Sequence, residues 1–221
     1  GNLLPAANTA NRAMGGISAG YAAPTTLNSV NPATYSDLIY STLDVGVEYD
    51  GRNLKQKDPL ASYKSNNAII SYMQFGFPLL MENKKARESK TAWAMSFGLK
   101  PISRINYKVQ SSFATTDSAN TIYEGAGGVN EAFIGTGIKF KNFSLGVNTG
   151  YLFGKKNYDN RLSFKSDTTN DYRTHYGTET NFGGVFLDAG VQYVAKLKKG
   201  ALRFGAYSTI QKKYHASRNN L

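Results

Sequence analysis

The chain has 221 residues, a formal net charge of +11, no cysteine and a high content of Tyr, Phe and Gly. The lack of cysteine excludes disulfides and thiolate metal sites, and no apolar run reaches the roughly 18 residues that a transmembrane helix needs. Lysine and arginine occur in small groups at predicted turns and strand ends. The positive charge therefore favours solvated or interfacial residues, and we expect no nucleic-acid partner.

Residues 1–41 differ from the rest of the chain. They are rich in Gly, Ala, Ser, Asn and Thr, and they show no sustained helical or strand period. This composition fits a disordered leader. It equally fits a packed segment in which Asn and Ser satisfy backbone groups and small side chains allow close approach. Pro32 has a fixed φ and favours an extended conformation at Asn31.

Seven later segments alternate between apolar and polar residues, as half-buried β-strands do. They cover residues 42–50, 68–77, 92–109, 132–140, 143–155, 184–197 and about 201–210. Pro101 predicts a bulge or kink in the third segment. The alternation predicts an all-β chain.

The predicted connections between these strands alternate in length. Long polar connections are expected at residues 51–67, 110–131 and 158–181, a charged one at 78–90, and short turns at 141–142 and 198–200. Long loops at one end and short turns at the other are typical of outer-membrane barrels, whose apolar strand faces contact lipid and whose polar faces line the lumen. A soluble sandwich or a lipocalin-like barrel is the alternative.

An odd strand number is unusual, because single-chain bacterial barrels normally have an even number. The last residues, HASRNNL, are expected to form a loop rather than a closing strand. We therefore expect residues 42–221 to be the first half of a longer barrel whose C-terminal half is missing, with residues 1–41 as a separate hatch or plug segment.

A family resemblance carries this interpretation further. NRAMGGISAG at residues 11–20, followed by LNSVNPATYS at residues 27–36, resembles the amino-terminal hatch of the FadL-type outer-membrane transporters of long-chain fatty acids and aromatic hydrocarbons. TAWAMSFGLKPISRINYKV and FSLGVNTGYLFGKK are similar to strands of that family, in the version found in Bacteroidota. The resemblance implies a transmembrane antiparallel β-barrel of about 14 strands, about seven of them here, with residues 1–41 folded into the lumen.

The resemblance also points to residues that hold or shift the plug and so gate a ligand path: Arg12, Gly15, Gly16, Asn31, Pro32 and Ala33. A buried charge needs a partner, so Arg12 is expected to pair with a carboxylate on a lumen-facing position, namely Asp44, Glu48 or Asp188. Four glycines share the lumen side of their strands, where they either allow a kink that opens a sideways exit or make room for the plug: Gly135, Gly137, Gly146 and Gly150.

No catalytic or metal-binding pattern is present in the sequence. His175 and His215 are expected outside the strands, with no Ser–His pair on the barrel wall. Residues 125–128 are expected to be a flexible loop, since a phosphate cradle would need a following Lys and a helix. Asp159, Asp167 and Asp171 do not have the spacing of a calcium loop. We expect no enzyme activity, no cofactor and no metal.

The leading functional hypothesis is an outer-membrane channel that takes up hydrophobic small molecules such as fatty acids. The alternative is an accessory or structural barrel in a multi-protein outer-membrane machine for secretion or barrel assembly, with outer-membrane proteins as partners. A second alternative is a soluble lipocalin-like binder. Both membrane hypotheses place the chain in the bacterial outer membrane, in contact with membrane lipid and lipopolysaccharide. The sequence does not identify the ligand.

Overall fold

A computed structural model describes residues 2–57, 60–80, 91–113, 118–165, 173–212 and 214–220. Over this part the chain is almost entirely β-structure, with a short helix α1 (Thr9–Ala13) and a 3-10 helix η1 (Pro32–Asp37). The strands are β1 (Asn2–Leu3), β2 (Thr42–Gln56), β3 (Ala61–Leu80), β4 (Thr91–Phe113), β5 (Ser118–Phe140), β6 (Phe143–Lys165), β7 (Arg173–Leu197), β8 (Gly200–Lys212) and β9 (His215–Asn220).

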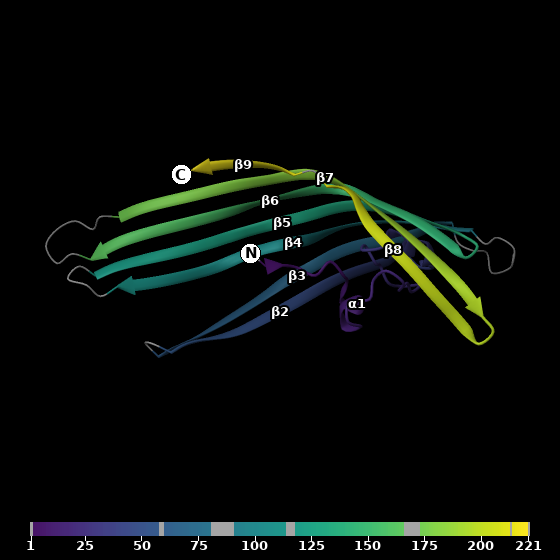
Figure 1. The fold of residues 1–221 in the computed structure, drawn as a ribbon, viewed down its shortest axis with the longest axis horizontal. Helices are drawn as coiled ribbons and strands as arrows, with labels where there is room; N and C mark the ends of the chain where they lie inside the picture. The colour runs from purple at the N-terminus through teal and green to yellow at the C-terminus, as the bar shows by residue number, and fades with distance from the viewer. Residues whose placement is uncertain are drawn as a thin grey trace.

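Seven of these strands form one antiparallel meander in the order of the chain, from β2 to β8. The sheet is long and curled, and the N-terminal segment lies against its inner side (Figure 1). β8 pairs with one half of β7, from Phe186 to Leu197, and β9 pairs with the other half, from Thr178 to Gly183. The predicted all-β, antiparallel architecture is therefore confirmed. The described residues form a curled sheet, and they do not form a closed barrel.

The predicted long loops are wrong, because the strands continue through most of them. β2 and β3 pair as far as Gln56 and Ala61, and β4 and β5 pair as far as Phe113 and Ala119. A strand is held by its main-chain ladder, so it persists where the side chains on both faces are polar and the alternation signal is lost. For the same reason residues 125–128 lie in β5 and HASRNN forms β9, where loops were expected. Residues 81–90 lie outside the described part.

The short turns and the proline irregularity are as predicted. β5 ends at Phe140 and β6 begins at Phe143, with Lys141 between them in the left-handed region at φ 56°. β7 and β8 are joined through Lys198 and Lys199. The β4–β5 register shifts between Pro101 and Ser103. Proline has no N–H for the ladder, so a register shift at this position is expected.

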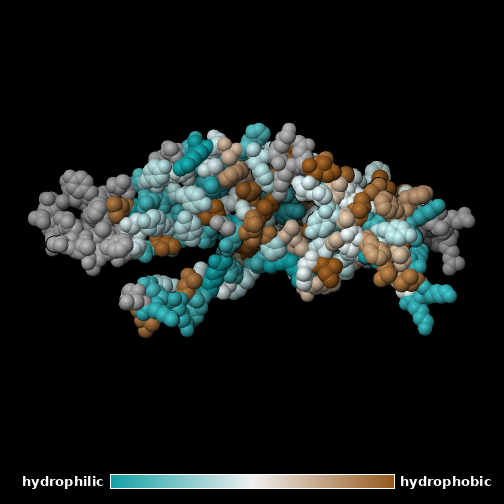
Figure 2. Space-filling model, viewed as in Figure 1, coloured by the Kyte–Doolittle hydropathy of each residue, from teal (hydrophilic) through white to brown (hydrophobic). Residues whose placement is uncertain are grey.

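The two faces of the curled sheet differ in chemistry. Leu145 on the outer face is 52% exposed, whereas its neighbour Ser144 on the inner face is 2% exposed. Outward-pointing apolar side chains gather over the half of the sheet next to the short turns, and they appear as brown patches in Figure 2. Within the described residues, no helix is long and apolar enough to cross a membrane.

The buried core lies between the N-terminal segment and the inner face. Leu27, Tyr35 and Leu38 supply the segment's side of this core. The sheet supplies Ala94, Phe133, Leu152 and Phe186. Burial of these side chains removes apolar area from water and stabilises the packing of the segment against the sheet.

β3 and β4 separate along half of their length. Their ladder runs from Leu80 and Trp93 to Met73 and Leu99, and it ends there. Beyond this point the β2–β3 hairpin leaves the plane of β4 to β7, and the chain's N-terminus lies between the two layers (Figure 1). Cavities lined by residues of β3, of β4 and of the chain's first residues lie between the separated strands, and we call this space the cleft.

Candidate functional site

The most constrained contact of the N-terminal segment is the one that Asn31, Pro32 and Ala33 make with the sheet. Gly137 pairs with Gly146, and Gly146 pairs with Gly190, so three glycines lie side by side across β5, β6 and β7. We call these three residues the glycine row. A Cβ at Gly137 would lie 2.6 Å from the Pro32 carbonyl oxygen, and a Cβ at Gly146 would overlap the Pro32–Ala33 peptide. Only glycine leaves space for this backbone.

The third glycine of the row has the same role. A Cβ at Gly190 would collide with the Asn31 side chain and with the Pro32 ring. Of the four glycines expected on the inner side, Gly137 and Gly146 make room for the segment, and Gly135 makes room for the Tyr35 ring and Asn148. Gly150 differs, because a Cβ there would meet the Ala132 backbone of the neighbouring strand.

Asparagine side chains hold the irregular backbone of the segment in place. Asn31 donates from Nδ2 to the Ala19 carbonyl at 2.7 Å, and its Oδ1 accepts from the Ala33 N–H at 3.2 Å, which caps η1. Asn28 donates to the Ser18 carbonyl at 2.6 Å. From the sheet, Asn148 donates to the Ser29 carbonyl at 2.8 Å. Buried backbone groups need such partners, and this explains the asparagine content of the segment.

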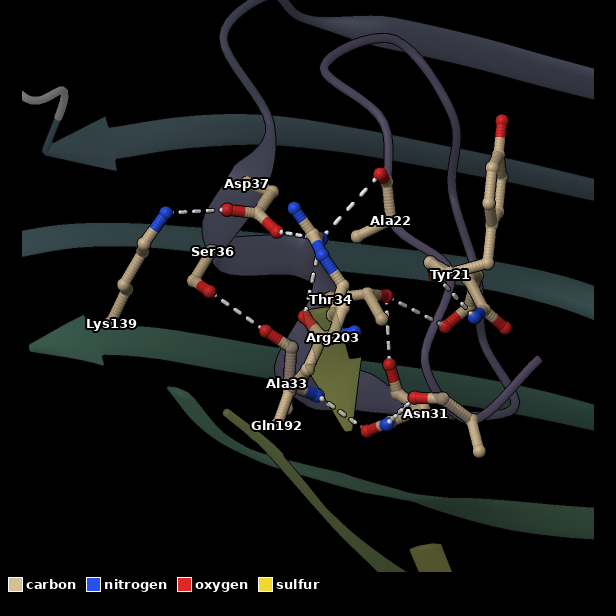
Figure 3. Close-up of polar contacts among 12 residues, drawn as sticks. Tyr21, Ala22, Asn31, Ala33, Thr34, Ser36, Asp37, Lys139, Gln192 and Arg203 are labelled. Carbon is tan, nitrogen blue, oxygen red and sulfur yellow. Dashed lines mark hydrogen bonds and ion pairs between the residues drawn. The ribbon is translucent and has the colours of Figure 1, made fainter. Parts of the chain in front are cut away.

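Asp37, at the end of η1, makes a second point of attachment. Its carboxylate lies 2.8 Å from Lys139 Nζ on β5 and 2.5 Å from Arg203 Nη1 on β8. Arg203 also approaches the Gln192 amide oxygen on β7 and the Ala22 carbonyl. Figure 3 shows Asp37 between the two cations. The carboxylate thus ties the segment to β5 and β8, and Arg203 extends the network to β7.

Arg12 makes the third point of attachment. Its guanidinium donates two hydrogen bonds to the Glu48 carboxylate on β2, at 3.0 and 3.3 Å. This contact raises the pKa of Arg12, with the hydrogen bond to Glu48 as the largest cause. About a third of each side chain remains exposed, so the pair is screened by solvent.

The other two carboxylates that were expected near Arg12 lie elsewhere. Asp44 accepts hydrogen bonds from the Tyr72 hydroxyl and from the Gln74 amide, each at 3.1 Å. Asp188 on β7 lines a small cavity of about 160 Å³ together with Ser29 and Lys100. The structure therefore brings Arg12 to Glu48. A gating role for any of these residues stays a prediction.

Gly15 and Gly16 end α1. Both have positive φ, at 77° and 84°, and the Gly15 N–H donates to the Arg12 carbonyl while the Gly16 N–H donates to the Asn11 carbonyl at 2.8 Å. This pair of bonds is a Schellman motif, for which glycine is preferred because the left-handed conformation is strained with a Cβ. Their local role is the termination of α1.

Asp37, Lys139 and Arg203 were missed by sequence reasoning, although one signal was available. Among residues 1–41 only Arg12 and Asp37 are charged. Both form ion pairs with strand residues. A single charge of each sign in an otherwise neutral packed segment indicates a fixed partner, because an unpaired charge is costly to bury.

The histidines do not form a catalytic arrangement in the part of the chain that the structure describes. Both lie in strands, where loops were expected. His175 on β7 contacts Asp159 on β6 at 3.0 Å, on an exposed surface. Across the described ranges, no three His, Cys, Asp or Glu residues cluster as metal ligands. Asp167 and Asp171 lie outside the described residues.

Tyr35 is the largest side chain that the segment buries. It is 0% exposed, and its ring lies against the inner face beside Asn148 and Ser96. Burial is the largest cause of a raised pKa of Tyr35, and the two polar neighbours act in the opposite direction. The phenol therefore stays neutral, as its packing requires.

A family model described as BamG matches residues 1–220. No curated protein and no solved structure matches the chain. The BamG match overturns the expectation of a FadL-type transporter, because it assigns both the N-terminal segment and the sheet to a different family. The motifs that carried the resemblance, Arg12, Gly15, Gly16 and Asn31 to Ala33, are explained here by helix termination, an ion pair and close backbone packing. Helix termination, ion pairing and close packing occur in many folds, so these residues do not by themselves indicate a transporter.

Proposed function

The chain belongs to the BamG family, and from that membership we propose that it is an accessory subunit of a barrel-assembly type machine in the bacterial outer membrane. The match over residues 1–220 carries the proposal, since it spans every described element. The partners would be outer-membrane proteins. This function agrees with the accessory hypothesis, which stood second after uptake of hydrophobic molecules.

The distribution of apolar residues supports a membrane position. A membrane strand needs about 9–11 residues, whereas β5 and β6 each have 23. Large exposed apolar residues on the outer face gather in the half next to the short turns, including Ile134, Ile138, Leu145, Val147, Val191 and Tyr193. On this proposal that half contacts the lipid, and the polar half of each strand projects beyond the bilayer.

If the sheet lies in a membrane, its two open edges must be paired. In the described residues β2 pairs only with β3, and β8 pairs only with β7. Unpaired backbone groups are too costly in hydrocarbon, so in a membrane both edges need further strands, from this polypeptide or from a partner. Closure into a barrel of about 14 strands, with the N-terminal segment as its plug, stays a prediction.

The way the N-terminal segment is held favours an accessory role over a channel. Two groups of ion pairs and the glycine row attach the segment to the inner face. A transported ligand would have to displace those contacts. The uptake hypothesis rested on the hatch motif of the transporter resemblance and on the alternating loop lengths, and the comparisons lend it no support.

Affinity isolation of the natural full-length chain from outer membranes, in a mild detergent, tests the proposal. We expect other outer-membrane proteins to be isolated with it in fixed proportion. An unrelated barrel of similar size with the same tag is the control. A protein that isolates alone, and whose depletion leaves the level of folded barrels unchanged, would contradict the proposal. Recovery without detergent would favour the soluble binder instead.

A further inference from the structure

The cleft between β3 and β4 leaves two long strand edges without a partner in the described part of the chain. β4 is paired with β5 along residues 105–113, and no described strand lies on its other side there. β3 is likewise paired only with β2 along residues 61–72. Such edges present rows of main-chain donors and acceptors that can pair with another extended chain.

The chain's own first residues show that the β4 edge accepts a strand. β1 enters the cleft and pairs antiparallel with β4, with Asn2 opposite Arg104 and Leu3 opposite Ser103. The Leu4 N–H also donates to the Ile102 carbonyl at 2.9 Å. Among the described residues, β1 lies opposite only Ser103 and Arg104 of this edge. The ladder between β3 and β4 ends two residues before Pro101, which has no N–H with which to extend it.

The cleft also provides side-chain sites of two kinds. A cavity of about 640 Å³ on one side of Leu4 is lined by apolar groups that include Ile70, Met73 and Leu99. A second cavity of about 630 Å³ is polar, and it is lined by Asp50, Asn67 and Asn106 among others. Ile69 and Arg104 border both cavities. Figure 2 shows the hollow between the β2–β3 hairpin and the remaining strands.

Arg104 gives the cleft a chemical preference. It donates to the Asn67 amide oxygen across the cleft at 3.2 Å. Among the described residues no carboxylate pairs with it, whereas Arg12, Arg52 and Arg203 each have one. An incoming carboxylate would therefore gain a charge-assisted hydrogen bond here.

We propose that the cleft binds one extended segment of another polypeptide, which adds a strand to the β4 edge beyond β1. Alternate side chains of the segment would fill the apolar cavity, and an acidic side chain would meet Arg104. Main-chain pairing supplies the affinity in this mode of recognition, and the side-chain sites supply the preference. The proposal rests on the proposed function in one respect only: the bound segment would belong to an outer-membrane partner or client protein.

Disulfide trapping tests the proposal directly, because residues 1–221 contain no cysteine. The probe is a synthetic decapeptide of alternating Val and Thr, with one Glu and one activated Cys, added to the purified full-length protein. Asn106→Cys lies on the β4 edge. Asn160→Cys is a control that is also exposed, on β6, which is paired on both sides. We expect trapping at position 106 to be about tenfold faster or more.

Two further arms identify the mode of binding. A peptide with Pro at alternate positions lacks the N–H groups for pairing, so it should lose the preference for position 106. Arg104→Gln should slow trapping of the Glu peptide but not of its Gln analogue. In the unsubstituted protein, the Val–Thr peptide should slow amide exchange across residues 105–113, which needs no variant.

Several outcomes would overturn the proposal. Equal trapping at positions 106 and 160, or equal trapping of the Pro peptide, would exclude strand addition. A cysteine at position 106 that is shielded from a small thiol reagent without peptide would show that the chain itself fills the edge. Trapping uses the isolated protein, so its success together with a failed affinity isolation would reject the accessory function alone.

Discussion

The Arg203 guanidinium and the Asp37 carboxylate lie 2.5 Å apart although 166 residues separate them in the chain. The same carboxylate contacts Lys139 on β5. The pair joins the last strand of the meander to the end of the N-terminal segment. Asp37 therefore links the N-terminal segment to two strands that are distant in the chain.

Asp37→Asn should destabilise the protein more than removal of an exposed carboxylate. The substitution leaves two half-buried cations without their counter-ion, at a cost between the limits for surface and buried pairs, about 1–3 kcal/mol. Chemical unfolding in detergent measures the free energy, and limited proteolysis reports release of the segment. Asp50→Asn, which removes the exposed partner of Arg52, is the matched control. Equal losses in the two variants would contradict the attachment role.

Gly146→Ala should weaken the packing of the N-terminal segment against the sheet, although the substitution deletes no side chain that contacts the segment. Its added Cβ would overlap the Pro32–Ala33 peptide, and overpacking of this kind costs about 1–3 kcal/mol. The measurement is the thermal midpoint together with protease sensitivity within residues 1–41. Gly51→Ala is the control, since its Cβ would meet nothing closer than 3.5 Å. If both variants behave like the natural chain, the glycine row does not position the segment.

The ion pair between Arg12 and Glu48 should contribute little to stability. Both side chains are about one-third exposed, and pairs of this kind typically have coupling energies of about 0.2–1 kcal/mol. A double-mutant cycle with Arg12→Gln and Glu48→Gln measures the coupling, which should fall further at high salt. A coupling several times larger would mean that the pair is buried more deeply in the functional assembly.

Tyr35→Phe should reduce the loss of stability at alkaline pH. Burial raises the pKa of Tyr35 above the value of about 10 that it has when unfolded. The contribution of the neutral Tyr35 phenol to the free energy of unfolding is therefore complete below about pH 10. This contribution is lost as the pH rises through the folded-state pKa. The unfolding free energies at pH 8 and at pH 11 should differ less in the variant. Tyr40→Phe, at an exposed position, should keep the full difference.

The strands next to the short turns could be predicted because apolar and polar side chains alternate along them. Alternation from Leu43 to Tyr49 and from Phe143 to Phe153 marks β2 and β6 there. The outer halves of the same strands could not be predicted, since residues such as 51–56 and 157–161 are mostly polar, with Leu54 and Tyr158 as exceptions, and carry no two-residue period. Their strand structure comes from pairing with neighbours, which is a non-local property.

The sequence by itself determined the all-β class, the two tight turns, the bulge at Pro101 and the unusual character of residues 1–41. Only the tertiary structure decided that Gly137, Gly146 and Gly190 lie in one row, that Asp37 meets Arg203, and that β3 leaves β4 to open a cleft. The difference has a physical cause. Periodicity and proline chemistry act over a few residues, whereas these contacts depend on the register between strands, which the whole sheet sets.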